Sequence, residues 1–254
     1  MCYALFLILI CGCNGAATGE REPVKDRFGA VTGFRNTGKE VYLLFSAHEY
    51  FEGVDIVLDA LDRHDVKVSF FFTGDCLRDP GNKETISLII NRGHYVGPHS
   101  DAHLLYVPWD VGPERDSLLV TREEFEGDLL ENIRALKPYG TGRQDVKWFL
   151  PPYEWYNREI VEWTGELGMM VVNFTPGIGT NADYTTPEMD NYRTSAEIME
   201  RLWDYEAENG LDGKILLIHP GVGPDRPDPL YVHLYDIIGD LKQKGYHISS
   251  LPGN

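Results

Sequence analysis

The stretch Val66-Lys67-Val68-Ser69-Phe70-Phe71-Phe72 is an apolar run of strand length, rich in β-branched and aromatic residues. Such a run predicts a buried β-strand. Residues 86–90 belong to a helix, and the short strand Tyr95-Val96 comes next. A strand, a helix and a second strand in succession are typical of a parallel βαβ unit.

The same alternation continues in both directions along the chain. We expect further strands at 41–45, 146–150, 169–174, 214–219 and 246–251, and helices near 54–61, 125–136, 158–167, 198–205 and 230–241. This makes about seven β/α units with no interior linker, so residues 38–254 form one domain. The pattern predicts an α/β fold, a (β/α)7 distorted TIM-like barrel.

Composition narrows the range of partners. The chain has 254 residues, is 43% hydrophobic and carries a formal net charge of −17. Such a surface repels phosphate backbones and anionic membranes, so we expect no nucleic-acid partner. A neutral or amine-bearing glycan would not be repelled.

The N-terminal residues resemble a bacterial lipoprotein signal. Residues 4–10 are continuously apolar but too short to span a bilayer, and Cys13 follows shortly after them. We expect a signal peptide at 1–12, lipidation of Cys13 and a tether over 13–37, which would place the protein in the bacterial cell envelope with a lipid anchor. The segment before the apolar run carries no Lys or Arg, so an ordinary secretory signal is the alternative. Cys76 is expected to be a packed thiol.

Chemically capable residues follow several of the predicted strands. His48 follows the first strand, His99 and His103 the third, Glu154 the fourth, and His219 the sixth. In parallel barrels the active site lies where strands end and loops begin. Two histidines four positions apart, on one helical turn, would share a face and could bind one divalent ion.

Six ordered motifs give the chain its family resemblance. They are VYLLF at 41–45, VKVSFFFTG at 66–74, GHYVGPHSDAH at 93–103, FLPPY at 149–153, ILLIH at 215–219 and KGYHI at 244–248. Together they resemble the polysaccharide deacetylases of the NodB-homology type, carbohydrate esterase family 4.

The resemblance implies a metal-dependent hydrolase that removes N- or O-linked acetyl groups from an acetylated glycan. It implies that His99 and His103 bind a divalent metal, with Zn²⁺ favoured and Co, Ni or Fe as alternatives. The ion would polarise the acetyl carbonyl and activate water. His219 would be the general acid.

The chain departs from the family where the resemblance requires carboxylates. The family pattern TFDDG would place aspartates at Ser46 and Ala47, and an arginine at Leu150. Loss of the arginine together with its carboxylate partner is coherent, because an unpaired buried charge is costly.

Two interpretations follow. In the first, the site is rebuilt: Glu49 becomes the third metal ligand, and Glu154 serves as general base, with His48 as a second candidate base. A solvated loop position for Glu49, and a helix N-terminal position for Glu154, are the alternatives.

In the second interpretation, the site is degraded and the protein is a non-catalytic glycan-binding lipoprotein. Rim aromatics, Tyr153 and Trp155 among them, would stack on sugars in either case. Asp101 is a further substrate-site candidate, which could orient a histidine or cap a turn.

Overall fold

Alternate residues of strand β3 (Glu40–Ala47) face opposite sides, and both sides are buried. Tyr42 and Leu44 pack with Trp148 in an inner core, whereas Leu43 and Phe45 pack in a larger outer core. Burial on both faces is typical of parallel strands covered by helices. The computed structural model describes residues 21–253.

The strands that pair around β3 are parallel. β3 pairs with β4 and β8, β4 pairs with β5, and β6 pairs with β7. Their bounds are Ser69–Phe72 for β4, Tyr95–Pro98 for β5, Trp148–Phe149 for β6, Met170–Val171 for β7 and Ile215–Ile218 for β8. The predicted (β/α)7 barrel is confirmed, although β6 and β7 are shorter than the apolar runs that predicted them.

Backbone bridges close the barrel between these strand groups. The N–H of Leu150, after β6, donates to the carbonyl of Pro98 at 3.3 Å. On the other side, Val31 pairs with Val172 and Gly33 pairs with Lys214. Strand β9 (His247–Ser249) pairs with the first residues of β3. A strand from the N-terminal segment therefore lies between β7 and β8.

That N-terminal segment differs from its prediction. β1 (Glu22–Lys25) and β2 (Val31–Arg35) form an antiparallel hairpin inside the range expected to be a tether. Val31 and Phe34 belong to the inner core, which explains why this part is folded. The predicted signal peptide and Cys13 lie outside the described residues. Within residues 21–253, no helix is long and apolar enough to cross a membrane.

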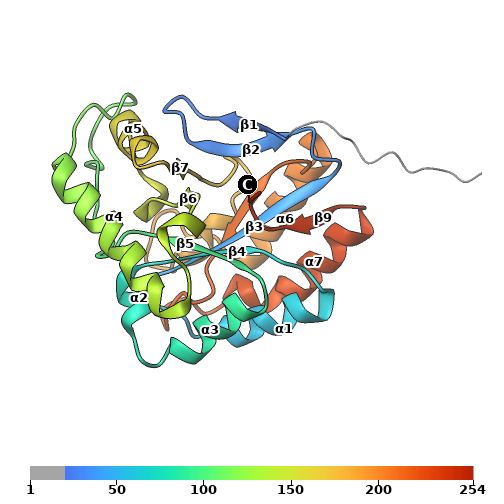
Figure 1. Cartoon of the computed structure of the whole chain (residues 1–254). Helices are drawn as coiled ribbons and strands as arrows, with labels where there is room; N and C mark the ends of the chain where they lie inside the picture. Colours follow the sequence, from blue (N-terminus) through green and yellow to red (C-terminus); the bar gives the residue numbers. More distant parts are fainter. Residues whose placement is uncertain (1–20, 254) are drawn as a thin grey trace, which may run out of the picture.

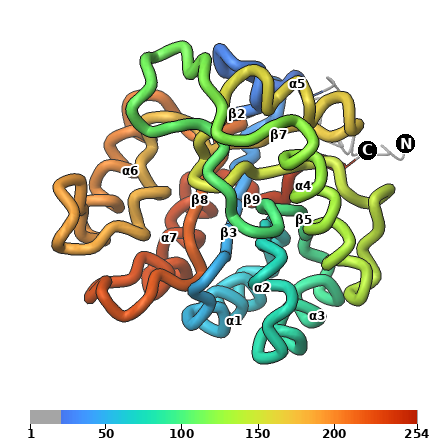
Figure 2. The backbone as a smooth tube through the Cα atoms, turned by 90° about the vertical axis from the view of Figure 1, so that its left-hand side faces the viewer, coloured from blue at the N-terminus to red at the C-terminus, as the bar shows by residue number. Residues whose placement is uncertain are grey.

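Helices surround the strands (Figure 1, Figure 2). They are α1 (Val54–His64), α2 (Gly74–Arg78), α3 (Lys83–Asn91), α4 (Arg122–Leu136), α5 (Arg158–Glu166), α6 (Ser195–Asn209) and α7 (Leu234–Gln243). The capping boxes predicted before α4 and α6 are both formed, by Thr121 with Glu124 and by Thr194 with Glu197. Short 3-10 turns complete the chain: η1 (Lys137–Tyr139), η2 (Arg143–Asp145), η3 (Pro152–Glu154), η4 (Thr180–Tyr184) and η5 (Leu230–His233).

Candidate active site

His99 follows β5 directly and is held from several directions. Its backbone N–H donates to Oδ1 of Asn132 at 2.8 Å, and its Nδ1 lies 2.8 Å from the carbonyl oxygen of Leu150. A carbonyl only accepts, so Nδ1 carries the proton and Nε2 keeps its lone pair. Burial lowers the pKa of His99 to about 3, so the ring is neutral.

Three imidazoles meet at this rim, and we call His48, His99 and His103 the histidine cluster. The rings of His99 and His103 lie 5.1 Å apart, and His48 stacks on His103 at 4.3 Å with 12° between the planes. Burial also lowers the pKa of His103, to about 2. The segment is not the helical turn considered from the sequence, because Ser100 and His103 both have positive φ values.

The predicted metal ligand set of His99, His103 and Glu49 is not formed. Glu49 is exposed, and within residues 21–253 no group of three or more His, Cys, Asp or Glu side chains is arranged to hold an ion. The rings of His48 and His103 are nearly parallel, so their in-plane lone pairs lie in separate planes and cannot meet at one ion without ring rotation. The donor set, as arranged, does not fit the implied Zn²⁺ site.

The vacated aspartate positions have become part of the buried sheet end. Ala47 is only 3% exposed and Ser46 only 1% exposed. Among the described residues, Ser46 Oγ has no hydrogen-bond partner. These two positions thus supply no carboxylate, and the next residue to face the site is His48, whose Nδ1 lies 3.2 Å from Oγ1 of Thr73.

His219 follows β8 and is fixed by a buried aspartate. Oδ1 of Asp183 lies 2.6 Å from its Nδ1, and Oδ2 accepts its backbone N–H at 2.8 Å. Burial alone would lower the pKa of His219, but the carboxylates of Asp183 and Glu154 outweigh it, so the pKa is raised. The imidazolium is therefore stabilised near neutral pH, with Nε2 left to face a reactant.

Asp183 was missed by the sequence analysis. It comes from η4, in the loop that follows β7, and it is fully buried. Nothing in its neighbourhood marks it out from other loop carboxylates. Only the fold brings it to His219.

Glu154 completes the acid–base group. It is partly buried in η3, and burial raises the pKa of its carboxyl to about 7, with His219 opposing and Asp183 reinforcing the rise. Both Glu154 and its neighbour Tyr153 have positive φ values, of 51° and 58°. Such strain in non-glycine residues gathers at functional sites. The helix α5 begins only after Asn157, so Glu154 is not a charge in its first turn.

The raised pKa of Glu154 predicts a pH-dependent cost in stability. Between 4.5, its ordinary value, and about 7, the folded chain keeps a proton that the unfolded chain has lost, so stability falls as pH rises. Glu154→Gln cannot ionise. We expect the free energy of unfolding of Glu154→Gln, relative to the wild type, to rise by about 3 kcal/mol between pH 4.5 and pH 7.5 in urea unfolding. A difference that stays constant over this range would contradict the assignment.

The three residues predicted to bind substrate, Tyr153, Trp155 and Asp101, lie in different surroundings. Tyr153 is 44% exposed and its ring lies 4.3 Å from His103. Trp155 is partly buried and donates from Nε1 to the carbonyl of Pro108 at 3.3 Å. Asp101 is engaged elsewhere, since both its oxygens accept from Arg78, at 2.6 and 3.0 Å. It orients no histidine and contacts none of the acid–base residues.

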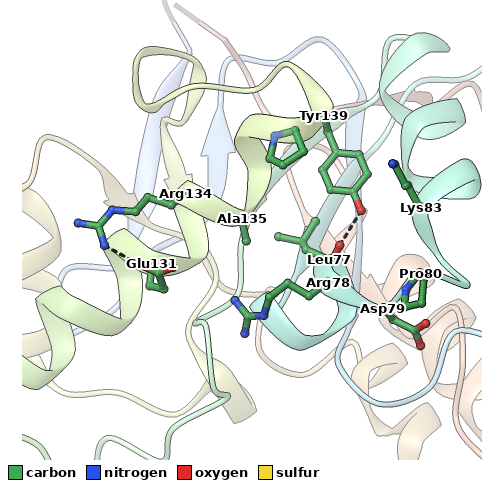
Figure 3. Close-up of a pocket in the computed structure, with 10 residues that line it drawn as sticks. Leu77, Arg78, Asp79, Pro80, Lys83, Glu131, Arg134, Ala135 and Tyr139 are labelled. Carbon is green, nitrogen blue, oxygen red and sulfur yellow. Dashed lines mark hydrogen bonds and ion pairs between the residues drawn. The ribbon is translucent and has the colours of Figure 1, made fainter.

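A surface hollow lies near that Arg78, away from the acid–base residues. Arg78, Lys83, Arg134 and Tyr139 line it, between α2 and the end of α4 (Figure 3). None of the predicted catalytic residues lines this hollow. The candidate active site is therefore the strand-end rim that holds His219, Glu154, Asp183 and the histidine cluster.

Comparison with known proteins agrees with the motifs. The polysaccharide deacetylase family profile matches residues 35–172, more than half of the 254-residue chain. The peptidoglycan-N-acetylmuramic acid deacetylase PdaA of Bacillus subtilis (strain 168) is 26% identical over 214 residues, which cover 84% of this chain and 70% of PdaA.

A second relative is longer than the chain. The uncharacterized protein YlxY of Bacillus subtilis (strain 168) is 25% identical over 200 residues, covering 79% of this chain. The chain spans only about half of YlxY, 52% of its length.

A solved structure shares the fold. BA3943 of Bacillus anthracis is described as a pseudoenzyme of carbohydrate esterase family 4. It is 20% identical to this chain with a TM-score of 0.66, and the match covers 87% of this chain and 66% of the BA3943 chain. A mutant of BA3943 is described as having restored enzymatic activity. The family profile, supported by the shared barrel, assigns the chain: it belongs to the polysaccharide deacetylase family.

Proposed function

We propose that the chain hydrolyses an acetyl group from a poly- or oligosaccharide, with Glu154 as general base and His219 as general acid. The observation that carries the proposal is the pairing of a carboxyl of pKa about 7 with an imidazole whose pKa is raised. Both environments favour the protonated form, so the carboxylate is a stronger base than usual and the imidazolium persists to higher pH than usual, which suits a base and an acid role. The substrate class rests on the family and on relatives named peptidoglycan deacetylases.

The proposed reaction begins with water. Ionised Glu154 takes a proton from a water molecule while the oxygen of that water bonds to the acetyl carbonyl carbon. The bond from that carbon to the sugar nitrogen or oxygen then breaks, and the imidazolium of His219 gives its proton to the leaving atom. The products are acetic acid and a free amine or hydroxyl. The proton on Glu154 then passes through solvent to His219, which restores the ionised carboxylate and the imidazolium.

Asp183 acts as a positioning residue in this scheme. It holds Nδ1 of His219, so that Nε2 is the atom that exchanges a proton with the leaving group. It also stabilises the positive charge of the imidazolium, as the raised pKa of His219 indicates. The arrangement resembles other carboxylate–histidine pairs, in which the carboxylate sets tautomer and orientation.

The predicted envelope location and lipid anchor at Cys13 belong to the proposal as well. A chain anchored at the cell surface would meet acetylated wall or capsular glycans there. Uncharged acetylated glycans are compatible with the acidic surface of the chain, whereas nucleic acids are not.

One alternative has specific support: a glycan-binding protein without activity. The missing carboxylate ligand, together with the exposed aromatic rings at the rim, favours it. Acetate release from N-acetylated chito-oligosaccharides, peptidoglycan and acetylated xylan, with and without added zinc, separates the two functions. Acetate release from any of them supports the hydrolase. Glycan binding with no release across the set supports the alternative.

A further inference from the structure

Exposed aromatic rings continue outward from the histidine cluster. Trp109 is 57% exposed, and its ring lies 5.4 Å from that of Tyr153 at 82° between the planes. Tyr153 in turn contacts His103, at 4.3 Å. The rings thus form a continuous path from solvent to the histidine cluster. Large apolar rings exposed together beside a polar site mark a binding surface.

Trp109 is held in place by a second layer of contacts. Its ring packs on Trp155 at 5.4 Å, and Trp155 donates to the carbonyl of Pro108. The guanidinium of Arg115 lies 3.3 Å from the ring centre of Trp155 and donates to the carbonyl of Tyr156 at 2.8 Å. The loop that carries Trp109 is therefore anchored at both sides of the tryptophan, and little ordering is needed when a ligand binds.

We propose that Trp109 and Tyr153 form a sugar-stacking subsite that binds the pyranose ring next to the one that carries the reacting acetyl group. This rests on the proposed function. The C–H groups on one face of a pyranose carry a slight positive charge, which suits the negative face of an aromatic ring. The nearby cation, Arg115, is already engaged by Trp155 and Tyr156, so the subsite suits an uncharged sugar.

A third ring extends the argument to a longer substrate. Tyr184, 45% exposed, lies 5.7 Å from the ring of His219. It comes from η4, whereas Trp109 and Tyr153 come from the segments after β5 and β6. Aromatic rings from separate loops thus adjoin the histidine cluster and His219, as expected of a site that takes several sugar units.

The test measures binding without turnover. Isothermal titration calorimetry measures the binding of fully N-acetylated chitopentaose and of acetylated xylopentaose to the full-length Glu154→Gln variant. The same titrations are done with the double variant that also carries Trp109→Ala. We expect Trp109→Ala to weaken binding of at least one of them about tenfold, and Trp109→Phe to restore it to within about threefold. Tyr235→Ala, an exposed aromatic on α7 that packs against Arg63, is the matched control and should leave affinity unchanged.

Three results would overturn the subsite. The first is the same affinity in Glu154→Gln with and without Trp109→Ala. The second is a loss of affinity in Tyr235→Ala equal to that in Trp109→Ala. The third is no binding of either pentasaccharide to Glu154→Gln. Failure of the proposed function is read separately, from acetate release by the wild-type chain. Binding that depends on Trp109 without any acetate release would sustain the subsite and refute the hydrolase.

Discussion

Replacing Glu154 with glutamine is expected to lower kcat for acetate release by about 10²- to 10⁴-fold, the usual contribution of a general base. Glutamine has the size of glutamate and adopts a positive φ as readily, so we expect the variant to fold into the same barrel. The loss follows because the amide cannot take a proton from water. Steady-state acetate release measures it, and circular dichroism checks the fold.

Glu162→Gln is the matched control for this variant. Glu162 is an exposed carboxylate on α5, the helix that follows the Glu154 segment, and its neutralisation should leave the rate unchanged. Activity of Glu154→Gln within about threefold of the wild type would remove Glu154 from the mechanism. His48 would then become the base candidate to test, because it faces the same rim.

Replacing His219 with asparagine is expected to cost a similar 10²- to 10⁴-fold in kcat. Asparagine can still accept or donate a hydrogen bond toward Asp183 but cannot carry the proton to the leaving group. The loss should be largest for N-acetyl substrates, since an amine leaves only when protonated. An O-acetyl ester with a more acidic leaving group should be affected less, and comparing the two substrates measures this.

His247→Asn is the control for His219. His247 is exposed in β9, so its replacement should change neither substrate's rate. An equal loss for amide and ester substrates in His219→Asn would contradict the assignment of His219 as the acid. It would leave the residue a role in binding alone.

The fold was largely predictable because its signals are local. Apolar runs such as Val66–Phe72 and capping boxes such as that of Thr121 and Glu124 depend on neighbouring residues only. The hairpin of β1 and β2 was missed because its packing comes from residues far along the chain, Val172 and Lys214. No short-range pattern reports such a contact.

The candidate site was predictable in part. His99 and His219 follow buried strands, so the topology places them on one rim, as expected. Glu49 was wrongly expected to reach the histidines, because nearness in sequence to Ala47 does not turn a side chain inward. Glu49 is exposed, and the residue between the two, His48, is the one that stacks on His103. Asp183 was invisible because its role depends on how the segment 176–193 folds over β8.

The conformation of Tyr153 and Glu154 also could not be predicted from the sequence. The PPY motif placed both residues at the rim, but the positive φ of each is a property of the folded loop. That conformation directs Tyr153 toward His103 and leaves Glu154 partly buried near His219. The sequence suggested a base here, and the burial that raises its pKa could only be read from the structure.

The pH dependence of kcat/KM for acetate release tests the central claim most directly. Glu154 must be ionised and His219 protonated, so we predict a bell-shaped profile whose acidic limb has an apparent pKa near 7. In Glu154→Gln the residual rate should lose this limb. A wild-type profile without a limb near pH 7, or the same limb persisting in Glu154→Gln, would contradict the account.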